Sequence, residues 1–233
     1  MSSIGVIRHR VTNKEGDIMR SIFVALLIAL LFIPLFANDD NFLDELIRNA
    51  ENGLAEAQFI LGVCYDLGEG VVKNDKQAVY WFEKAANQGI AEAQFCIGLS
   101  YYHGEGVVKN YKQAVYWYEK AAVQGYAPAQ FNLGLCYYNG EGVVKNYMQA
   151  VYWFEKAANQ GIAGAQNNLG NCYGYGEGVV RNYQTAYFWY LLAAANGNEL
   201  AKGNMDKIAK QLSSAQQSEI QARATRWFEE HQE

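Results

Sequence analysis

The sequence from Ala55 to Asn198 consists of four copies of one 36-residue pattern, placed head to tail without insertion or gap. The copies begin at Ala55, Ala91, Ala127 and Ala163. A fixed period of this length is typical of solenoid proteins, in which each unit packs only against its neighbours. Residues that recur in every copy are therefore expected to hold the stack together, and residues that differ between copies are expected to carry specificity.

Each copy is predicted to form two helices. In the first copy a buried face on the first helix is indicated by small or apolar residues at helical spacing: Ala57, Leu61, Gly62 and Tyr65. The second helix has an inward stripe that repeats the same spacing: Ala78, Trp81, Phe82 and Ala85. An αα-hairpin with two such faces cannot bury its apolar surface alone, so we expect it to stack on the next hairpin.

A glycine-rich loop separates the two helices. Gly68 and Gly70 predict a backbone with positive φ or a close approach to a neighbour, and Val71 and Val72 are expected to insert into the core. Asn74 with Gln77 three residues later is the capping-box pattern and predicts the start of the second helix. Further boundaries are predicted by Gly89, as the residue that ends the second helix, and by Pro128, in the first turn of the next.

One tryptophan occupies the same position in the second helix of every copy: Trp81, Trp117, Trp153 and Trp189. An aromatic side chain of this size dominates packing where it is buried. Because the position recurs four times, we interpret these residues as core, in preference to an aromatic cage for a sugar or choline.

The pattern A-x-A-x-x-x-L/I-G-x-x-Y-x-x-G-x-G-V, followed by A-x-x-W-[FY]-x-K-A-A and a glycine, resembles the Sel-one-like repeat (SLR) family, a long-loop relative of the tetratricopeptide repeat. The resemblance covers Ala55 to Asn198, with departures at Gly174 and Leu192 in the last copy. It implies an all-α fold, a right-handed α-solenoid whose first helices line the concave surface. It also implies a role in binding proteins or peptides.

Residues before the repeats predict export. An apolar stretch at residues 22–37 follows Met19 and Arg20 and is shorter than the roughly 20 residues needed to span a bilayer, so residues 19–37 are expected to be a signal peptide cleaved after Ala37. Met19 is then interpreted as the natural start of translation, which makes residues 1–18 an extension that was assigned in error. The alternative is that residues 1–18 are a long polar first part of the signal peptide. The expected location is the periplasm or the extracellular space.

Capping helices are predicted on both sides of the four repeats. An N-terminal capping helix is expected within residues 38–54 and a pair of C-terminal capping helices within 199–233, divided near Ser213 and Ser214. The four repeats between them are expected at 55–90, 91–126, 127–162 and 163–198.

The charge distribution argues against some partners. The formal net charge is −5, and no cluster of Lys and Arg occurs, so neither a nucleic acid nor an anionic membrane is an expected partner. Membrane contact is expected only through the signal sequence, and we expect a monomer.

Positions on the first helices that differ between copies are the candidate binding residues. They pass from apolar and aromatic in the early copies to amide-rich in the later ones. The predicted groove residues are Leu99, Tyr102, His103, Asn132, Leu135, Tyr138, Asn167, Asn168 and Asn171. We hypothesise that an extended peptide, or a cell-wall peptide or glycan strand, lies along them with its amides or hydroxyls bonded by the asparagines. In the same region Phe59, Phe95 and Phe131 either face this groove or pack between repeats.

No catalytic residue, metal ligand set or cofactor is predicted. The three histidines have no ligand-spaced partner, and no S-x-x-K or G-x-S-x-G motif occurs. The four cysteines are expected to be small buried hydrophobes, since Cys64, Cys136 and Cys172 share a register that places them too far apart for disulfides.

Two further functions remain open beside the binding scaffold. A cysteine-rich secreted branch of the SLR family is similar, and that similarity implies a penicillin-binding or β-lactamase-like hydrolase, although this chain lacks the branch's paired cysteines in each repeat. The third is a toxin-immunity or virulence accessory protein.

Overall fold

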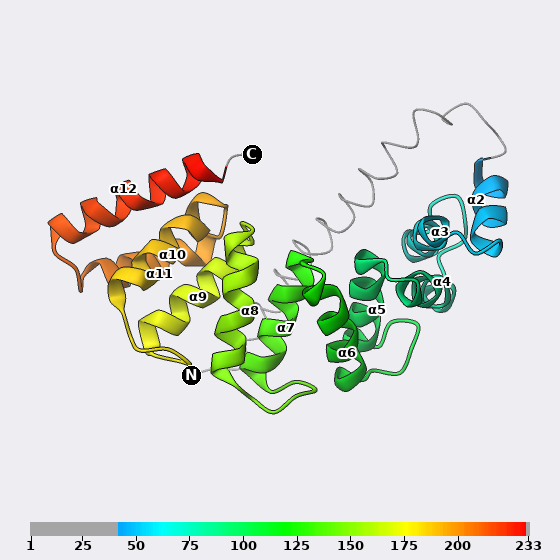
Figure 1. The fold of residues 1–233 in the computed structure, drawn as a ribbon, viewed down its shortest axis with the longest axis horizontal. Coiled ribbons are helices and arrows are strands. Elements are labelled where there is room, and N and C mark those ends of the chain that lie inside the picture. Colours follow the sequence, from blue (N-terminus) through cyan, green and yellow to red (C-terminus); the bar gives the residue numbers. More distant parts are fainter. Residues whose placement is uncertain (1–41, 232–233) are drawn as a thin grey trace. The chain divides into compact units, whose positions relative to one another are not determined.

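The computed structural model describes residues 42–231, where the chain forms eleven helices and no strand (Figure 1). The predicted extension, the predicted signal peptide and residues 38–41 lie outside the described residues. The helices are α2 (Phe42–Glu51), α3 (Ala55–Leu67), α4 (Asp75–Asn87), α5 (Ala91–His103), α6 (Tyr111–Val123), α7 (Ala127–Asn139), α8 (Tyr147–Asn159), α9 (Ala163–Tyr175), α10 (Tyr183–Ala195), α11 (Glu199–Ala209) and α12 (Ser214–Glu230).

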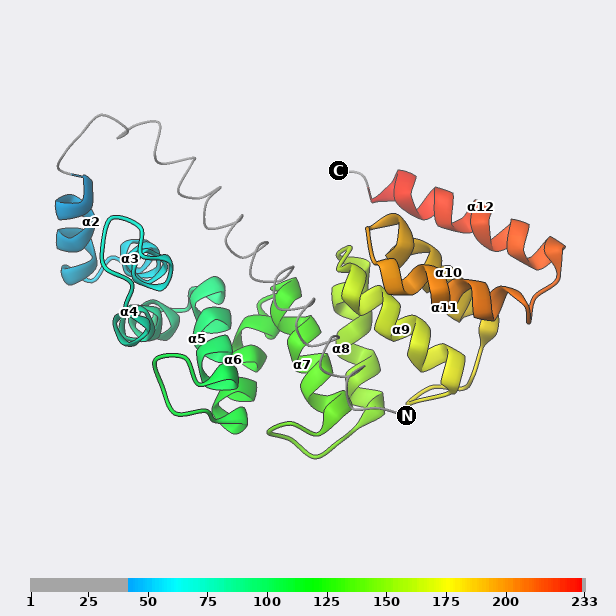
Figure 2. The ribbon, with the colours of Figure 1, turned by 180° about the vertical axis from the view of Figure 1, so that it is seen from behind.

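The helices belong to two compact units that divide after Asn110. In the first unit, α2 packs on α3, α3 on α4 and α4 on α5. In the second unit, each helix from α6 to α10 packs on the next one in chain order, and α12 packs on α10 (Figure 2). Consecutive helix pairs stacked in this way form an all-α repeat solenoid, which confirms the fold class predicted from the 36-residue period.

Each first helix of a repeat ends at a glycine in the left-handed conformation, with φ of 77° at Gly68 and 79° at Gly140. The second glycine of the loop is needed for a different reason. A Cβ added to Gly142 would overlap the backbone carbonyl of Tyr111, at the start of α6 in the preceding repeat. The same overlap would occur between Gly178 and Tyr147. At this glycine the loop lies directly against the backbone of the preceding repeat, an approach that only glycine permits.

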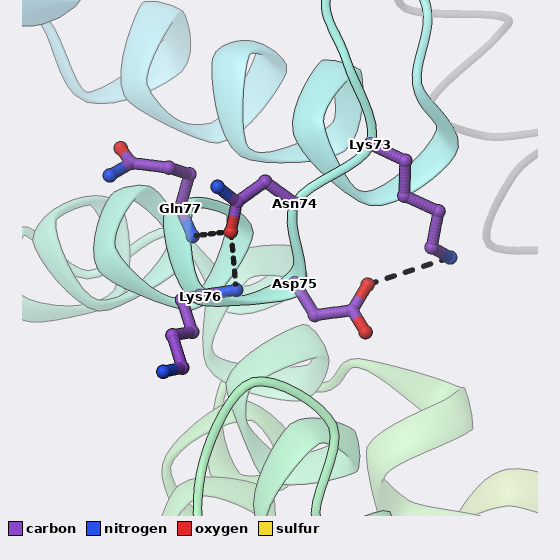
Figure 3. Close-up of polar contacts among 5 residues, drawn as sticks. All are labelled: Lys73, Asn74, Asp75, Lys76 and Gln77. Atoms are coloured by element: carbon purple, nitrogen blue, oxygen red, sulfur yellow. Dashed lines mark hydrogen bonds and ion pairs between the residues drawn. The ribbon is translucent and has the colours of Figure 1, made fainter.

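An asparagine side chain begins the second helix of a repeat, as predicted. Asn74 Oδ1 accepts hydrogen bonds from the backbone N–H groups of Lys76 and Gln77, both at 3.2 Å (Figure 3). Asn146 and Asn182 cap α8 and α10 in the same way, each at 3.1 Å. The complete two-way capping box is present at Ser213 and Gln216, where α12 begins.

The expectation that both valines of the loop insert into the core is wrong for the second one. The exposed fraction is between 87% and 90% for Val72, Val108, Val144 and Val180. The valine before each of them is half-buried, and Val179 packs against the core of the second unit. Side chains on extended backbone alternate between opposite sides, so only one valine of the pair can point inward.

The large aromatic residues pack inside the repeats. Trp81 and Trp117 are buried and Trp153 and Trp189 are half-buried, which confirms their interpretation as core residues. The exposed fraction of Phe59, Phe95 and Phe131 is 6%, 0% and 2%. Of the two interpretations of these phenylalanines, packing between repeats is therefore the correct one.

A buried glutamine in the first helix of each repeat joins three segments of the chain. In α9, Gln166 Nε2 donates to the carbonyl of Ala158 in α8 at 3.0 Å, and Gln166 Oε1 accepts from Asn196 Nδ2, which follows α10, at 3.0 Å. Gln130 repeats the arrangement with Ala122 and Gln160, and Gln58 repeats it with Ala50 and Gln88. Gln94 donates to Ala86.

These buried glutamines lead to the first prediction. Gln166→Leu keeps the volume of the side chain but removes its hydrogen bonds to the Ala158 carbonyl, which keeps the one from the Gly161 N–H, and to the Asn196 amide. Because each hydrogen bond contributes about 0.5–1.5 kcal/mol, we expect the free energy of unfolding to fall by about 2 kcal/mol. Urea denaturation followed by circular dichroism measures the change.

The matched control is Gln149→Leu, which makes the same substitution at an exposed position of α8. We expect its unfolding midpoint to stay within experimental error of the parent. Equal midpoints for the two variants would show that the buried amide adds nothing to the stack.

Candidate functional site

The predicted groove residues lie on three first helices, and six of them belong to the second unit. Leu99, Tyr102 and His103 lie on α5 of the first unit, all half-buried. The remaining six lie on α7 and α9: Asn132, Leu135, Tyr138, Asn167, Asn168 and Asn171. These two helices approach closely, since a Cβ added to Gly164 of α9 would lie 2.9 Å from the ring of Phe131 in α7.

The structure places the Asn167 side chain against the chain itself. Its side chain is only 7% exposed, and Asn167 Oδ1 accepts a hydrogen bond from Asn204 Nδ2 of α11 at 3.2 Å. Asn171 is half-buried and its Oδ1 accepts from Tyr190 at 2.8 Å and from Asn204 at 3.4 Å. Both amides therefore attach α9 to the helices that follow it. The sequence signal for this contact is Asn204 itself, in the predicted C-terminal capping segment.

Asn132 and Asn168 are the amides that remain. They occupy equivalent positions in successive repeats, one on α7 and one on α9, and both are half-buried. Within residues 42–231 neither side chain has a hydrogen-bond partner. Each amide offers one carbonyl acceptor and an NH₂ group with two donors, so the pair presents two equivalent polar groups at the spacing of the repeat.

Tyr138 is fixed by contacts within its own repeat and to the next one. Its hydroxyl donates to Glu177 Oε2 of the next repeat at 2.6 Å, its ring packs against Tyr147 of its own repeat, and Lys145 Nζ lies 5.9 Å from its ring centre. Burial and the neighbouring Glu177 carboxylate raise the pKa of the Tyr138 phenol far above its ordinary value, so the hydroxyl stays protonated as a donor. The predicted site residue Tyr138 thus attaches the Glu177 loop to α7.

The equivalent contact in the first unit is built from carboxylates. Asp66 stands at the position of Tyr138, Asp75 at that of Tyr147 and Glu105 at that of Glu177. Burial raises the pKa of the Asp66 carboxyl, the nearby Lys73 lowers it, and Asp75 and Glu105 raise it further. Lys73 forms a 3.5 Å ion pair with Asp75 (Figure 3).

This substitution of a carboxylate for tyrosine gives the second prediction. Because the pKa of Asp66 is raised on folding, its ionised form destabilises the folded state at neutral pH, and that penalty is lost as the pH falls towards the pKa of the unfolded chain. We expect Asp66→Asn to raise the free energy of unfolding by about 0.5 kcal/mol at pH 7, the size of other partly exposed like-charge contacts. The gain should shrink as the pH approaches 4.

Denaturation midpoints of the parent and the variant across this pH range measure the effect. Glu69→Gln, at an exposed position of the same loop, serves as the charge-matched control. A constant difference between Asp66→Asn and the parent at every pH would contradict the assignment.

The cysteines do not provide a nucleophile at neutral pH. All four are free, and Cys136 and Cys172 are buried. Burial, with a smaller contribution from a nearby glutamate, raises the pKa of each of these two thiols to about 12, so they stay protonated. Within residues 42–231 no group of three His, Cys, Asp or Glu side chains could hold a metal ion.

Comparisons with known proteins identify the repeat. Four segments match the Sel1 repeat, at residues 55–90, 91–126, 127–162 and 163–198. The crystal structure of a protective antigen present in uropathogenic Escherichia coli strains, displaying an SLR fold, is 38% identical over 81% of this chain, with a TM-score of 0.74. This chain spans 41% of that antigen's length.

A Sel1 repeat protein from Oxalobacter formigenes is 35% identical, and the match covers 79% of this chain and 73% of that one, with a TM-score of 0.65. No curated protein matches the chain in sequence. Among the helices of residues 42–231, none combines the length and the apolar character that a membrane span requires.

Proposed function

We propose that this chain, which belongs to the Sel1 repeat family, is a scaffold that binds an extended peptide segment across α7 and α9. The observation that supports the proposal is the pair Asn132 and Asn168. Their amides recur in register on two successive first helices, are partly accessible, and have no partner within the described residues.

An amide side chain matches the backbone of an extended peptide. In an extended chain the N–H and the C=O of one residue point to the same side, so one asparagine can donate to that carbonyl and accept from that N–H. Packed helices lie about 8–10 Å apart, and an extended chain advances about 3.3 Å per residue. Two asparagines one repeat apart would therefore bond peptide groups about three residues apart.

The residues beside this pair suit the side chains of such a segment. Leu135 lies one turn after Phe131 on α7, is half-buried and packs against the core of the second unit. Tyr138, held by Glu177, adds an aromatic wall on the same helix. Backbone bonding by the asparagines would supply affinity with little sequence preference, and the contacts of Leu135 and Tyr138 would supply the preference.

The third prediction tests this binding site. Peptides that bind the purified chain are selected from a displayed library of unstructured sequences, and their affinities are measured by fluorescence anisotropy. We expect Asn132→Ala and Asn168→Ala each to weaken binding about tenfold, because each removes hydrogen bonds with a net value of about 1–1.5 kcal/mol.

Met148→Ala, at an exposed position of α8, should leave the affinity unchanged and serves as the control. A library that gives no binder, or binders that the double variant Asn132→Ala/Asn168→Ala holds as tightly as the parent, would remove the proposal.

Export is the second part of the proposed role. The apolar stretch at residues 22–37 supports a signal peptide that directs the scaffold out of the cytoplasm, where its partners would be envelope or extracellular peptides. The fourth prediction is that the chain, produced in full in a bacterium, is recovered outside the cytoplasm with Asn38 as its first residue. N-terminal sequencing of the fractionated protein decides this, and an intact N-terminus on cytoplasmic protein would contradict it.

A further inference from the structure

A small apolar cleft opens between α3 and α5 in the first unit. Its volume is about 100 Å³. The residues that line it are Glu56, Phe59 and Ile60 of α3, Ile90 at the start of α5, and Glu92 of α5. This volume is smaller than a cavity of about 150 Å³ that holds a benzene ring, so the cleft suits an unbranched side chain better than an aromatic one.

The floor and the rim of the cleft differ in character. Phe59 is buried, and Ile60 and Ile90 are half-buried, so the inner surface is apolar. Glu56 and Glu92 are equivalent residues of two successive repeats and stand on either side of it. Within residues 42–231 neither carboxylate forms an ion pair.

The charge of the whole unit has the same sign as the rim. Residues 42–110 carry ten Asp and Glu side chains against five Lys and Arg, whereas residues 111–231 carry nine against ten. The acidic character of the chain therefore belongs to the first unit. A field of one sign around a cleft attracts ligands of the opposite charge and raises their rate of association.

The repeat itself does not require these carboxylates. In the third and fourth repeats the position of Glu56 and Glu92 is occupied by Pro128 and Gly164, and the position of Ile60 is occupied by Asn132 and Asn168. A residue needed for stacking would recur in all four copies. The two glutamates and the isoleucine are therefore local features of the repeats that form the cleft.

We propose that this cleft binds the side chain of a lysine or arginine from a basic peptide segment. The methylene stem lies against Phe59, Ile60 and Ile90, and the cationic end lies between the carboxylates of Glu56 and Glu92. Long cationic side chains bury their stems on apolar surface while their charged ends remain at the rim. The site is separate from the asparagine pair of the second unit, so it stands whether or not that pair binds a peptide.

The fifth prediction uses the mature chain and an acetylated peptide of alternating glycine and lysine, titrated by nuclear magnetic resonance. We expect the amide signals of Phe59, Ile60 and Ile90 to shift on binding. Glu56→Gln and Glu92→Gln should each weaken binding about threefold, and together about tenfold, because each removes one ion pair at the exposed rim. Ile60→Asn should also weaken it, by removing part of the surface for the stem.

Three controls separate the site from general attraction between opposite charges. Glu83→Gln removes the same charge at an exposed position of α4 in the same unit and should leave the affinity within about twofold of the parent, because a distant exposed charge is largely screened. The same peptide with norleucine in place of lysine lacks the cation, and the peptide with glutamate lacks both cation and stem. Both should bind at least about tenfold more weakly than the lysine peptide.

The outcomes that overturn the proposal are distinct. Equal losses in Glu83→Gln and the rim variants would show only general attraction, and equal binding of the norleucine peptide would show an apolar cleft without charge recognition. Signals that shift elsewhere than at the cleft would also overturn it. The variants Asn132→Ala and Asn168→Ala should have no effect in this titration, which keeps its result independent of the function proposed for the second unit.

Discussion

The stack depends on one buried amide per repeat. The last carbonyl groups of a helix have no partner in the helical hydrogen-bond pattern and need other donors. The Ala158 carbonyl near the end of α8 accepts from the Gly161 N–H and also from Gln166 Nε2 of α9, each at 3.0 Å. Gln166 Oε1 in turn accepts from Asn196, at the end of its own repeat. The glutamine therefore adds a hydrogen bond across the boundary between repeats to a helix end that its own turn already bonds. This explains how a polar residue with 0% exposure can belong to a core.

The fold could be predicted from the sequence because the same 36-residue pattern occurs four times. The period predicted the helix pairs, the glycines predicted the loop, and Asn74 predicted the start of the second helix. Each of these features depends on residues that are close together in the sequence. The buried glutamines were not predicted, because a glutamine at a helical position looks like a solvated residue until the end of the preceding helix is placed above it. The prediction that both loop valines are buried was wrong for a related reason. The loop backbone is extended, so successive side chains point to opposite sides.

For the candidate site, the sequence could predict only which equivalent positions of the repeats vary. Comparing equivalent residues drew attention to the asparagines of α7 and α9, but could not tell which of them would be used inside the chain. Asn204 of α11 lies outside the repeats, and its bonds to Asn167 and Asn171 depend on how the closing helix packs on α9. Asn132 and Asn168 occupy a different position on their helices and do not bond Asn204. The sequence shows where the amide side chains are, and the packing of α11 determines that Asn167 and Asn171 are bonded within the chain.

Equivalent positions in the two units carry opposite physical characters, and this follows from how a repeat tolerates change. In the second unit Tyr138 donates a hydrogen bond to Glu177. In the first unit Asp66 occupies the equivalent position, so the attractive contact is replaced by repulsion between carboxylates. The stack persists because its glutamine bridge and its glycine contacts do not involve that position. Residues outside those two contacts are free to vary in charge from copy to copy. One scaffold can therefore present an acid-rimmed apolar cleft on its first repeats and neutral amides on its last.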